Sequence, residues 1–226
     1  MARTLKGRIV DLSHKLYPGK EEYHLNLTTN NTADLYPQYK VDDGVWYILQ
    51  DIEISSHTGT HIEFPYHHNR HGMDAAAFPL ERLIGDCVLL NFRHKKMGDT
   101  VTLEELKGYD DMIKEGDMLL FDFDCAKYYR TERSHDRPVI SHDAIKWLIF
   151  NKKISLIGSD ASGIELKGVP NQPNHQILMD NEIPVIEFAA NLDRLKQRRF
   201  TLLALAIPIH GLDSCPVRLI AVEEEE

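Results

Sequence analysis

Short runs of apolar, β-branched and aromatic residues recur along the chain, separated by polar and turn-forming residues. Such runs predict strands, because side chains of this kind fit a pleated, partly buried surface. The runs at 154–158 and 201–209 are the most apolar and predict buried strands. The predicted strands cover residues 7–12, 45–55, 86–92, 118–123, 154–158, 184–186, 200–209 and 217–222.

Helix signals are fewer than strand signals. Thr102 opens a capping-box pattern, with glutamate three residues later, and predicts a short helix. Ser141 is placed as the N-cap of a helix over 142–152, in which the apolar residues share one face. Shorter helical stretches are predicted at 191–198 and 75–83.

Strands outnumber helices in this pattern. It therefore predicts an α/β or α+β fold built on a central sheet or barrel with a few helices. Residues 23–43 show little periodicity, which predicts a long loop, often a functional element where one occurs. No repeat, low-complexity tract or linker marks a boundary, so we expect a single domain over residues 1–226.

Composition narrows the classes of function. The chain has 226 residues with 42% hydrophobic residues, enough for a sizeable core, and a net charge of −9 that argues against nucleic-acid binding. No apolar run approaches the roughly 20 residues of a membrane span. The first residues lack an apolar signal core, and three widely spaced cysteines suit a reducing compartment. We expect a cytoplasmic protein whose partner is a small molecule, with neither nucleic acid nor membrane.

Histidines gather in one segment of fifteen residues. A helix is disfavoured there by the threonines around Gly59 and by Pro65. In an extended chain, alternate residues point to the same side, so the odd-numbered ligand-type residues share a side. These residues are His57, His61, Glu63 and His67, whereas His68 and His71 break the alternation and predict a solvated loop.

The spacing of the first two histidines requires a bend. In a straight strand, His57 and His61 would lie about 13 Å apart, too far for two nitrogens each about 2 Å from one metal ion. Gly59 is the residue that permits a bend between them. Glu63 would then reach the same ion, and His67 would lie near enough to carry protons. The alternative is a chance cluster of surface histidines.

The segment from His57 to His67 reads His-Thr-Gly-Thr-His-Ile-Glu-Phe-Pro-Tyr-His. It resembles the His-x-Gly-Thr-His-x-Asp-x-Pro-x-His signature of the cyclase family of metal-dependent hydrolases, which includes kynurenine formamidases and isatin hydrolases. The resemblance extends over nearly the whole chain. Further matching positions are Asp-Leu-Ser-His at 11–14, Gly-Ser-Asp with a following serine at 158–162, His175, Glu187, and Pro-Val-Arg at 216–218.

The resemblance implies a swivelling β/β/α fold, a homodimer or homotetramer, and one or two divalent ions, zinc or manganese. It implies that His57, His61 and Glu63 hold a first ion. Glu63 as a bridging carboxylate, His175 and Glu187 would hold the second. It also implies that His67 is the catalytic acid/base in hydrolysis of an amide or formamide by an activated water.

Three features depart from the family pattern. Glu63 stands where the family has aspartate, which changes the reach of the expected bridging ligand. His210 and Cys215 are either added ligands or, as we favour, a loop histidine and an inert buried thiol. Residues 121–124, Phe-Asp-Phe-Asp, replace a stretch that is often Thr-Gly, and would disfavour an anionic substrate if they face the pocket.

Two positions outside the histidine segment leave alternatives open. Ser13, next to His14, is either a nucleophile or, as we favour, part of a structural strand end. Asp160 either orients a ligand histidine or caps a turn.

The walls of the pocket are predicted only loosely. His135 and Arg137 either gate the pocket or belong to a mobile surface loop. Trp46, Tyr66 and the 23–43 loop are candidate pocket walls.

The leading hypothesis is a metal-dependent hydrolase that cleaves an amide, formamide or lactam bond of a small cyclic or aromatic substrate. The alternative is a non-catalytic metal- or small-molecule-binding protein on the same fold, altered by Glu63. A formamidase of tryptophan breakdown is a narrower third interpretation, because family membership does not fix the substrate.

Overall fold

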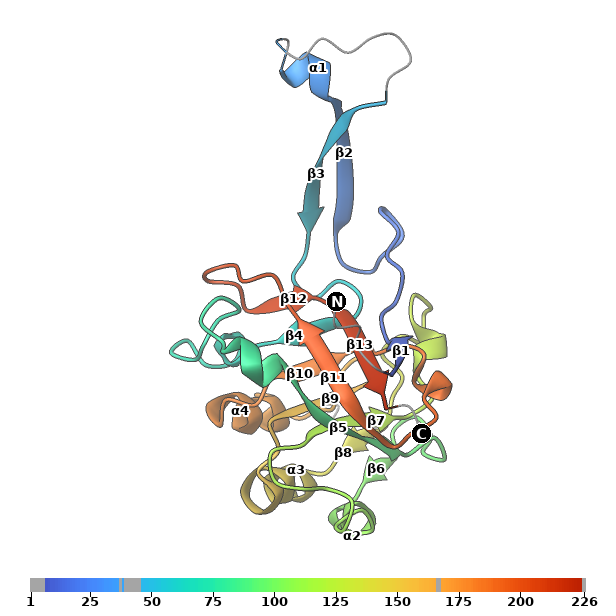
Figure 1. The fold of residues 1–226 in the computed structure, drawn as a ribbon. Helices are drawn as coiled ribbons and strands as arrows, with labels where there is room; N and C mark the ends of the chain where they lie inside the picture. Colours follow the sequence, from blue (N-terminus) through green and yellow to red (C-terminus); the bar gives the residue numbers. More distant parts are fainter. Residues whose placement is uncertain (1–6, 37, 39–45, 166–167, 225–226) are drawn as a thin grey trace.

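A curled sheet of nine strands forms the body of the molecule (Figure 1). The computed structural model describes residues 7–36, 38, 46–165 and 168–224. The strands of this sheet lie in the spatial order β1-β13-β11-β5-β7-β9-β10-β4-β12. Their bounds are β1 Arg8–Asp11, β13 Arg218–Glu223, β11 Arg199–Leu205, β5 Ile84–Asn91, β7 Met118–Asp122, β9 Leu156–Ser159, β10 Val185–Glu187, β4 His61–Glu63 and β12 Ser214–Pro216.

The sheet mixes parallel and antiparallel pairs. Strands β5, β7, β9 and β10 run parallel to their neighbours in that order, while β4, β11, β12 and β13 add antiparallel pairs. The mixed α/β fold with one large curled sheet and few helices agrees with the class that the sequence predicted.

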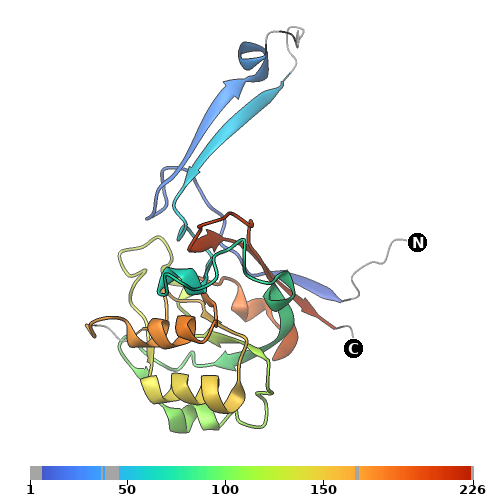
Figure 2. The same cartoon turned by 90° about the vertical axis from the view of Figure 1, so that its left-hand side faces the viewer.

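Both faces of the sheet are packed. Along β7, Leu119 and Phe121 point into one apolar cluster, and Met118 and Leu120 point into the other. The first cluster includes side chains of the helices that cover one face (Figure 2). These helices are α2 Leu103–Lys107, α3 His142–Trp147 and α4 Pro173–Asp180. The near-continuous apolar runs of the sequence reflect this burial on two sides.

The helix caps form as predicted. Thr102 and Glu105 exchange both hydrogen bonds of a capping box, and the Ser141 side chain accepts the N–H of Ala144. Helix α3 continues as a π-helical turn, η4 Leu148–Lys152, so the predicted helix over 142–152 is confirmed.

Two of the predicted helical stretches contain only a single 3₁₀ turn each. Residues 191–198 contain only η5 Leu192–Arg194, and residues 75–83 contain only η2 Leu80–Leu83. The predicted strand at 200–209 also ends early, at Leu205. The other short elements are η1 Pro65–His67, η3 Ala126–Tyr128, and the parallel pair β6 Thr100–Val101 and β8 Val139–Ile140.

The prediction of a long loop over 23–43 is wrong. Strand β2 Leu25–Asn31 pairs antiparallel with β3 Ile48–Ile54, and helix α1 Thr32–Leu35 follows β2. The cause of the error is the composition of β2, in which asparagine and threonine dilute the apolar alternation. Residues 37 and 39–43 of the predicted loop, and residue 45 of the predicted strand 45–55, lie outside the described residues.

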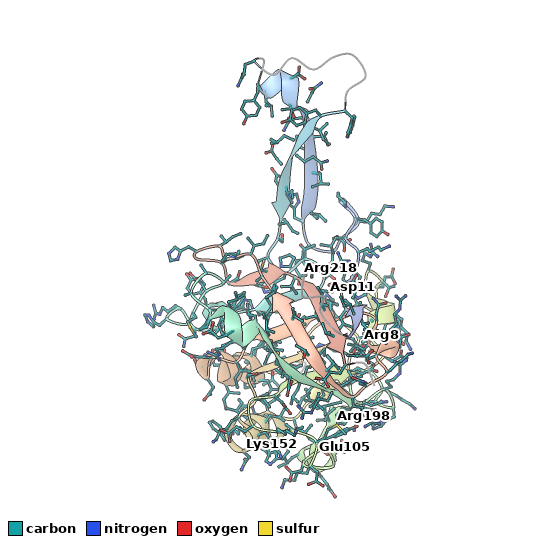
Figure 3. The ribbon with its side chains drawn as sticks, viewed as in Figure 1. Arg8, Asp11, Glu105, Lys152, Arg198 and Arg218 are labelled. Carbon is teal, nitrogen blue, oxygen red and sulfur yellow. The ribbon has the colours of Figure 1, made fainter. Side chains whose placement is uncertain are left out.

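We call the β2–β3 hairpin with α1 the arm. It projects from the body in both views (Figures 1 and 2). The β1–β13 edge of the large sheet is held by ion pairs. There Arg218 contacts the carboxylate of Asp11, with Nη2 2.8 Å from Oδ2, beside Arg8 (Figure 3).

Candidate metal centre

The chain bends sharply between the first two histidines, as their spacing requires. Gly59 has a φ of +70°, and a Cβ at this position would lie 2.3 Å from Cδ2 of Leu16. The bend brings the ring centroids of His57 and His61 to 5.0 Å. Strand β4 starts directly after this bend.

Pairing between strands brings the acidic ligands together. His61 lies directly opposite Glu187 on the antiparallel strand β10, so the two side chains share a face of the sheet. Their Nε2 and Oε2 atoms are 3.7 Å apart. Glu63 is two residues further along β4 and therefore points to the same side. Helix α4 adds His175.

Glu63 lies at the centre of the arrangement. Its Oε1 is 3.3 Å from Nε2 of His57 and 3.9 Å from Nε2 of His61. Its Oε2 is 3.6 Å from Nε2 of His175, and that nitrogen is also 3.6 Å from Oε1 of Glu187. Ligand atoms held tetrahedrally about 2 Å from one ion lie about 3.3 Å from each other. These separations therefore fit metal-ligand sets without rearrangement of the backbone.

Three buried polar atoms test whether a metal ion fits. Nε2 of His57, Nε2 of His61 and Oε2 of Glu63 are buried and make no hydrogen bond within the described part of the chain. Leaving such atoms unsatisfied is costly, and a coordinated cation would satisfy all three. Two groups of ligand atoms meet at Glu63: His57, His61 and Glu63, and Glu63, His175 and Glu187.

The electrostatics of the centre favour positive charge. Burial opposes a charge on His175, but Glu165 and Glu187 outweigh it through hydrogen bonds and raise the pKa of His175 to about 10. In His61, the carboxylates of Glu63 and Glu187 likewise raise the pKa against the effect of burial. Burial would raise the pKa of Glu63, but the neighbouring imidazoles of His57, His61 and His175 hold it well below its usual value. A divalent cation could take the place of the protons that this field attracts.

His67 lies at the rim of the centre rather than on a strand. It ends the 3₁₀ turn η1, and its Nε2 is 3.7 Å from Oε1 of Glu63. Its Nδ1 is 2.9 Å from Oδ2 of Asp213, a residue that the sequence analysis did not single out. His57, His67 and Asp213 form a third group with metal-ligand spacing. Asp213 has no spacing signal of its own, because strand pairing beside β4 brings it to the site.

Glu165 is a second residue that sequence reasoning missed. Its Oε2 is 3.1 Å from Nδ1 of His175, and it also accepts the backbone N–H groups of Asn174 and His175. The carboxylate thus fixes the ring of His175 with Nε2 towards Glu63. Asp160 has no such role: it accepts the N–H groups of Phe123, Cys125 and Ala126 and caps that turn.

The predictions for the remaining histidines and for Cys215 have mixed outcomes. His71 is exposed, as expected, but the prediction of a solvated loop is wrong for His68, which is half-buried and stacks on His175 with ring centroids 5.4 Å apart. His210 is an exposed loop residue beside Asp74, and Cys215 is buried with the pKa of its thiol raised by burial. Neither belongs to a group with metal-ligand spacing among the described residues.

Three further alternatives are settled by contacts. Ser13 accepts the N–H of Leu219 with its hydroxyl, which fits the structural strand end. Arg137 is buried rather than on a mobile surface, and it donates to the carbonyl groups of Ser162 and Glu165. The acidic residues of the 121–124 stretch pair with Arg93 and belong to none of the groups with metal-ligand spacing among the described residues.

Polar and charged residues outnumber hydrophobic residues in the lining of the pocket over the centre. Tyr23 and Phe188 are its aromatic hydrophobic members, whereas Trp46 and Tyr66, which the sequence suggested as walls, do not line it. His135 lines it, with Nε2 2.6 Å from Oε1 of Glu22. The full lining is Tyr23, His57, Glu63, His67, His135, Arg137, Ser162, Glu165, Gln172, His175, Glu187 and Phe188.

Comparison with known proteins shows the family of the chain. The model of the Cyclase family, described as "Putative cyclase", matches residues 10–166. The chain belongs to this family. It is 26% identical over 217 residues to the kynurenine formamidase of Erythrobacter litoralis, covering 96% of this chain and 94% of that protein.

Solved structures share the fold. An isatin hydrolase bound to the product analogue thioisatinate matches with a TM-score of 0.84 and 19% identity, over 97% of this chain and 94% of the other. A predicted metal-dependent hydrolase from Bacillus stearothermophilus matches with a TM-score of 0.74 and 25% identity, over 95% and 97% of the two chains. No helix in the described residues is long and apolar enough to cross a membrane.

Proposed function

We propose that this chain is a metal-dependent hydrolase that cleaves an amide, formamide or lactam C–N bond of a small cyclic or aromatic substrate. The observation that carries the proposal is the carboxylate of Glu63, which lies between two groups of ligand atoms. Buried Nε2 atoms of His57 and His61 face this carboxylate and make no hydrogen bond among the described residues. The relatives named kynurenine formamidase and the isatin hydrolase structures support the class of bond.

The proposed ligands are His57, His61 and Glu63 for a first ion, and Glu63, His175 and Glu187 for a second. A divalent ion in this position supplies Lewis acidity, which polarises a carbonyl group and makes a water molecule nucleophilic at neutral pH. Imidazole and carboxylate ligands suit both zinc and manganese, so we propose one or two ions of either metal per chain.

His67 is the proposed acid/base. With Nδ1 donating to Asp213, its Nε2 faces the pocket and is the atom that takes up a proton and returns it to the leaving nitrogen. Asp213 would hold the ring in this orientation and stabilise the protonated form, as carboxylates do beside catalytic histidines. This pair would contribute about 10²–10⁴-fold to the rate.

Other residues of the pocket would bind and orient the substrate. Tyr23 and Phe188 offer aromatic faces for a ring. The guanidinium of Arg137, fixed by two backbone carbonyl groups, places a positive charge near Glu187 in the wall of the pocket. This charge would stabilise the negative charge that develops on a substrate oxygen.

The alternative of a non-catalytic binding protein depends on the longer side chain of Glu63. With its additional methylene group, Glu63 still reaches His57 on one side and His175 on the other. No contact of this residue favours an inactive centre, so we retain the hydrolase.

A chelation experiment tests the proposal. Protein purified without chelators or a histidine tag is screened against aryl formamides and lactams, then stripped of metal and reloaded with zinc or manganese. We expect hydrolysis that disappears on stripping and returns with one of the two ions. Hydrolysis at an unchanged rate in the metal-free protein would reject the metal mechanism. A metal-loaded protein that hydrolyses none of these substrates would favour the binding protein.

We also propose a location and an assembly. All three cysteines are buried and free, which supports a reducing compartment, and we propose the cytoplasm. We further propose that residues 1–226 form one domain and that the chain is a homodimer or homotetramer without nucleic-acid or membrane partners.

A further inference from the structure

The segment that follows β9 forms one wall of the pocket over the metal centre. Ser162 in this segment lines the pocket together with Arg137 and Glu187. The next residue, Gly163, has a φ of +98°. A Cβ at Gly163 would lie 2.4 Å from Oε1 of Glu187 and 3.7 Å from Nη2 of Arg137. The segment therefore packs against both a proposed metal ligand and a guanidinium group.

The hydroxyl group of Ser162 has no partner. The residue is 9% exposed, and its Oγ is buried and makes no hydrogen bond within the described part of the chain. A buried hydroxyl without a hydrogen bond lowers the stability of a folded protein, because its lost contacts with water are not replaced. The same state of His57, His61 and Glu63 is explained by the proposed metal ions. Ser162 is not a proposed ligand, so its hydroxyl requires a different partner.

Ser159, the last residue of β9, is a serine with a structural role close by. It is fully buried, and its Oγ accepts the N–H of Ala161 at a distance of 3.2 Å. The same hydroxyl donates to the carbonyl oxygen of Ala161 at 3.4 Å. The Ser159 side chain thus holds the backbone of this segment in place. The Ser162 hydroxyl makes no bond of this kind, so the fold does not depend on it.

Arg137 is a buried cation whose hydrogen bonds go to backbone carbonyl groups. Its Nε donates to Ser162 at 2.8 Å, and its Nη1 donates to Glu165 at 2.6 Å. Burial lowers the pKa of Arg137 despite the nearby carboxylates of Glu187 and Glu165. Buried charges are normally paired with an opposite charge. Nη2 is the nitrogen of this guanidinium that is left to bind a group in the pocket.

The chemistry of the two side chains defines what they can bind together. A guanidinium only donates hydrogen bonds, whereas a hydroxyl donates or accepts, so a group bound by both is an acceptor. Nε and Nη1 of Arg137 already donate to the backbone. The guanidinium therefore offers Nη2 rather than the paired nitrogens that hold a carboxylate. One nitrogen and the hydroxyl of Ser162 match a single oxygen atom of a ligand.

We propose that Ser162 is a catalytic residue, and that its hydroxyl and Nη2 of Arg137 both donate hydrogen bonds to the oxygen of the scissile carbonyl group. When water adds to the carbonyl carbon, His67 takes a proton of the water and the carbonyl oxygen becomes negatively charged. When the C–N bond breaks, the C=O double bond forms again and the leaving nitrogen takes the proton from His67. Donors that are already in place stabilise this charge in the transition state. The inference rests on the proposed function, because it assigns the donors to the same reaction.

The same substitution at two serines tests the inference. Ser162→Ala removes the hydroxyl without a partner, and Ser159→Ala removes the hydroxyl that bonds the backbone. Kinetics are measured on the metal-loaded proteins with an aryl formamide or lactam that the wild type hydrolyses, and metal content is determined for each preparation. We expect Ser162→Ala to lower kcat about 10²–10³-fold, as loss of one such donor does, with unchanged metal content and a KM within about threefold of the wild type.

Thermal stability provides a readout that does not depend on turnover. Because the Ser162 hydroxyl is buried without a hydrogen bond, Ser162→Ala should raise the Tm measured without substrate by about 2–4 °C. Ser159→Ala should lower the Tm by about as much and keep kcat within about threefold of the wild type. The two variants therefore differ both in the sign of the stability change and in the size of the rate change.

Four results would overturn the inference. Wild-type kcat in Ser162→Ala would do so and leave the proposed function in place. A lower Tm in Ser162→Ala would show that the hydroxyl has a partner within the protein. An equal loss of kcat in Ser159→Ala would assign the effect to the whole segment. A metal-loaded wild type that hydrolyses none of these compounds would reject the proposed function, and the role of Ser162 with it.

A second variant covers the case in which Ser162→Ala does not fold. Ser162→Cys keeps a side chain of similar shape, but its thiol is a weaker hydrogen-bond donor than the hydroxyl. We expect kcat of Ser162→Cys to lie between those of the wild type and a variant without a donor, again with unchanged metal content. An unchanged kcat in Ser162→Cys would overturn the inference.

Discussion

Strands of the nine-stranded sheet and strands of the arm alternate apolar and polar residues in the same way, but their apolar sides have different surroundings. In β11, Phe200, Leu202 and Ala204 are buried beneath the body's own core. In β3, Ile52 and Ile54 are exposed. Alternation therefore identifies a strand and its apolar side without identifying what covers that side. In the sheet the cover is the same chain, whereas in the arm Leu27, Ile52 and Ile54 remain exposed.

The proposed metal ligands also distinguish the body from the arm. All five proposed ligands come from the body: the bend before β4, β4 itself, α4 and β10. Tyr23, two residues before the arm, lines the pocket, whereas Trp46 and Tyr47 beyond it are exposed. The body would thus hold the metal, and no residue of the arm lines the pocket over the metal centre.

Removal of a central metal ligand should abolish metal binding in the body and leave the arm unchanged. His61→Ala is expected to lose bound metal and to lower kcat/KM by about 1000-fold or more, since metal activation is worth several kcal/mol. Molar mass should stay that of the wild type. Elemental analysis, kinetics and light scattering on one preparation check this, and full turnover without metal would contradict it.

Loss of the proposed acid/base should separate chemistry from metal binding. His67→Ala is expected to lower kcat by about 10²–10⁴-fold while metal content stays unchanged, because proton transfer is lost but the five ligands remain. His71→Ala, an exposed histidine four residues away, is the matched control and should keep wild-type kcat. If metal content falls with kcat, His67 is a ligand instead.

A smaller effect is expected from the carboxylate behind the centre. Glu165→Gln weakens the hold on Nδ1 of His175 and should lower metal affinity about 10–100-fold, as loss of such supporting contacts does. Competition with a chelator of known affinity measures the change. Glu182→Gln, just beyond the other end of α4, should leave metal affinity unaltered.

The smallest effect concerns stability of the sheet and its dependence on pH. Arg8 and the N–H groups of Lys196 and Gln197 hold the pKa of Glu223 below its ordinary value, against the opposing effect of burial. A carboxylate whose pKa is lower in the folded protein stabilises the fold at pH values above its pKa in the unfolded chain. This stabilisation is lost as the pH falls through the pKa of the folded state. Glu223→Gln should cost about 1–2 kcal/mol of unfolding free energy at pH 7.

That cost should diminish below about pH 4, where the unfolded carboxylate protonates. Glu53→Gln, in an exposed pair on the arm, should change stability by much less at either pH. Denaturant unfolding of both variants at the two pH values compares the regions directly. Equal losses for the two variants would contradict the difference between sheet and arm.

Much of the body could be predicted because its caps, strands and bends depend on residues close together in the sequence. Capping residues at Thr102 and Ser141, apolar strands and the bend at Gly59 all follow from neighbouring residues. The histidine segment predicted its own geometry for the same reason. His175 and Glu187 came only from resemblance to a family, because no local rule links them to residues over 100 positions earlier.

The remaining features depend on tertiary contacts. Asp213 and Glu165 reach the centre through the pairing of β12 with β4 and through the start of α4, and neither has a motif. The arm was missed because β2 is rich in asparagine and threonine, so its pairing with β3 supplies what its own sequence lacks. Trp46 was predicted as a pocket wall, but it is exposed and does not line the pocket.

Metal content per chain tests the central claim most directly. Protein purified without chelators or a histidine tag is analysed for zinc and manganese, as isolated and after incubation with each ion. We predict about one to two equivalents of one metal per chain in the wild type, and almost none in His61→Ala. A wild type that binds neither ion tightly under any of these conditions would contradict the account of the centre.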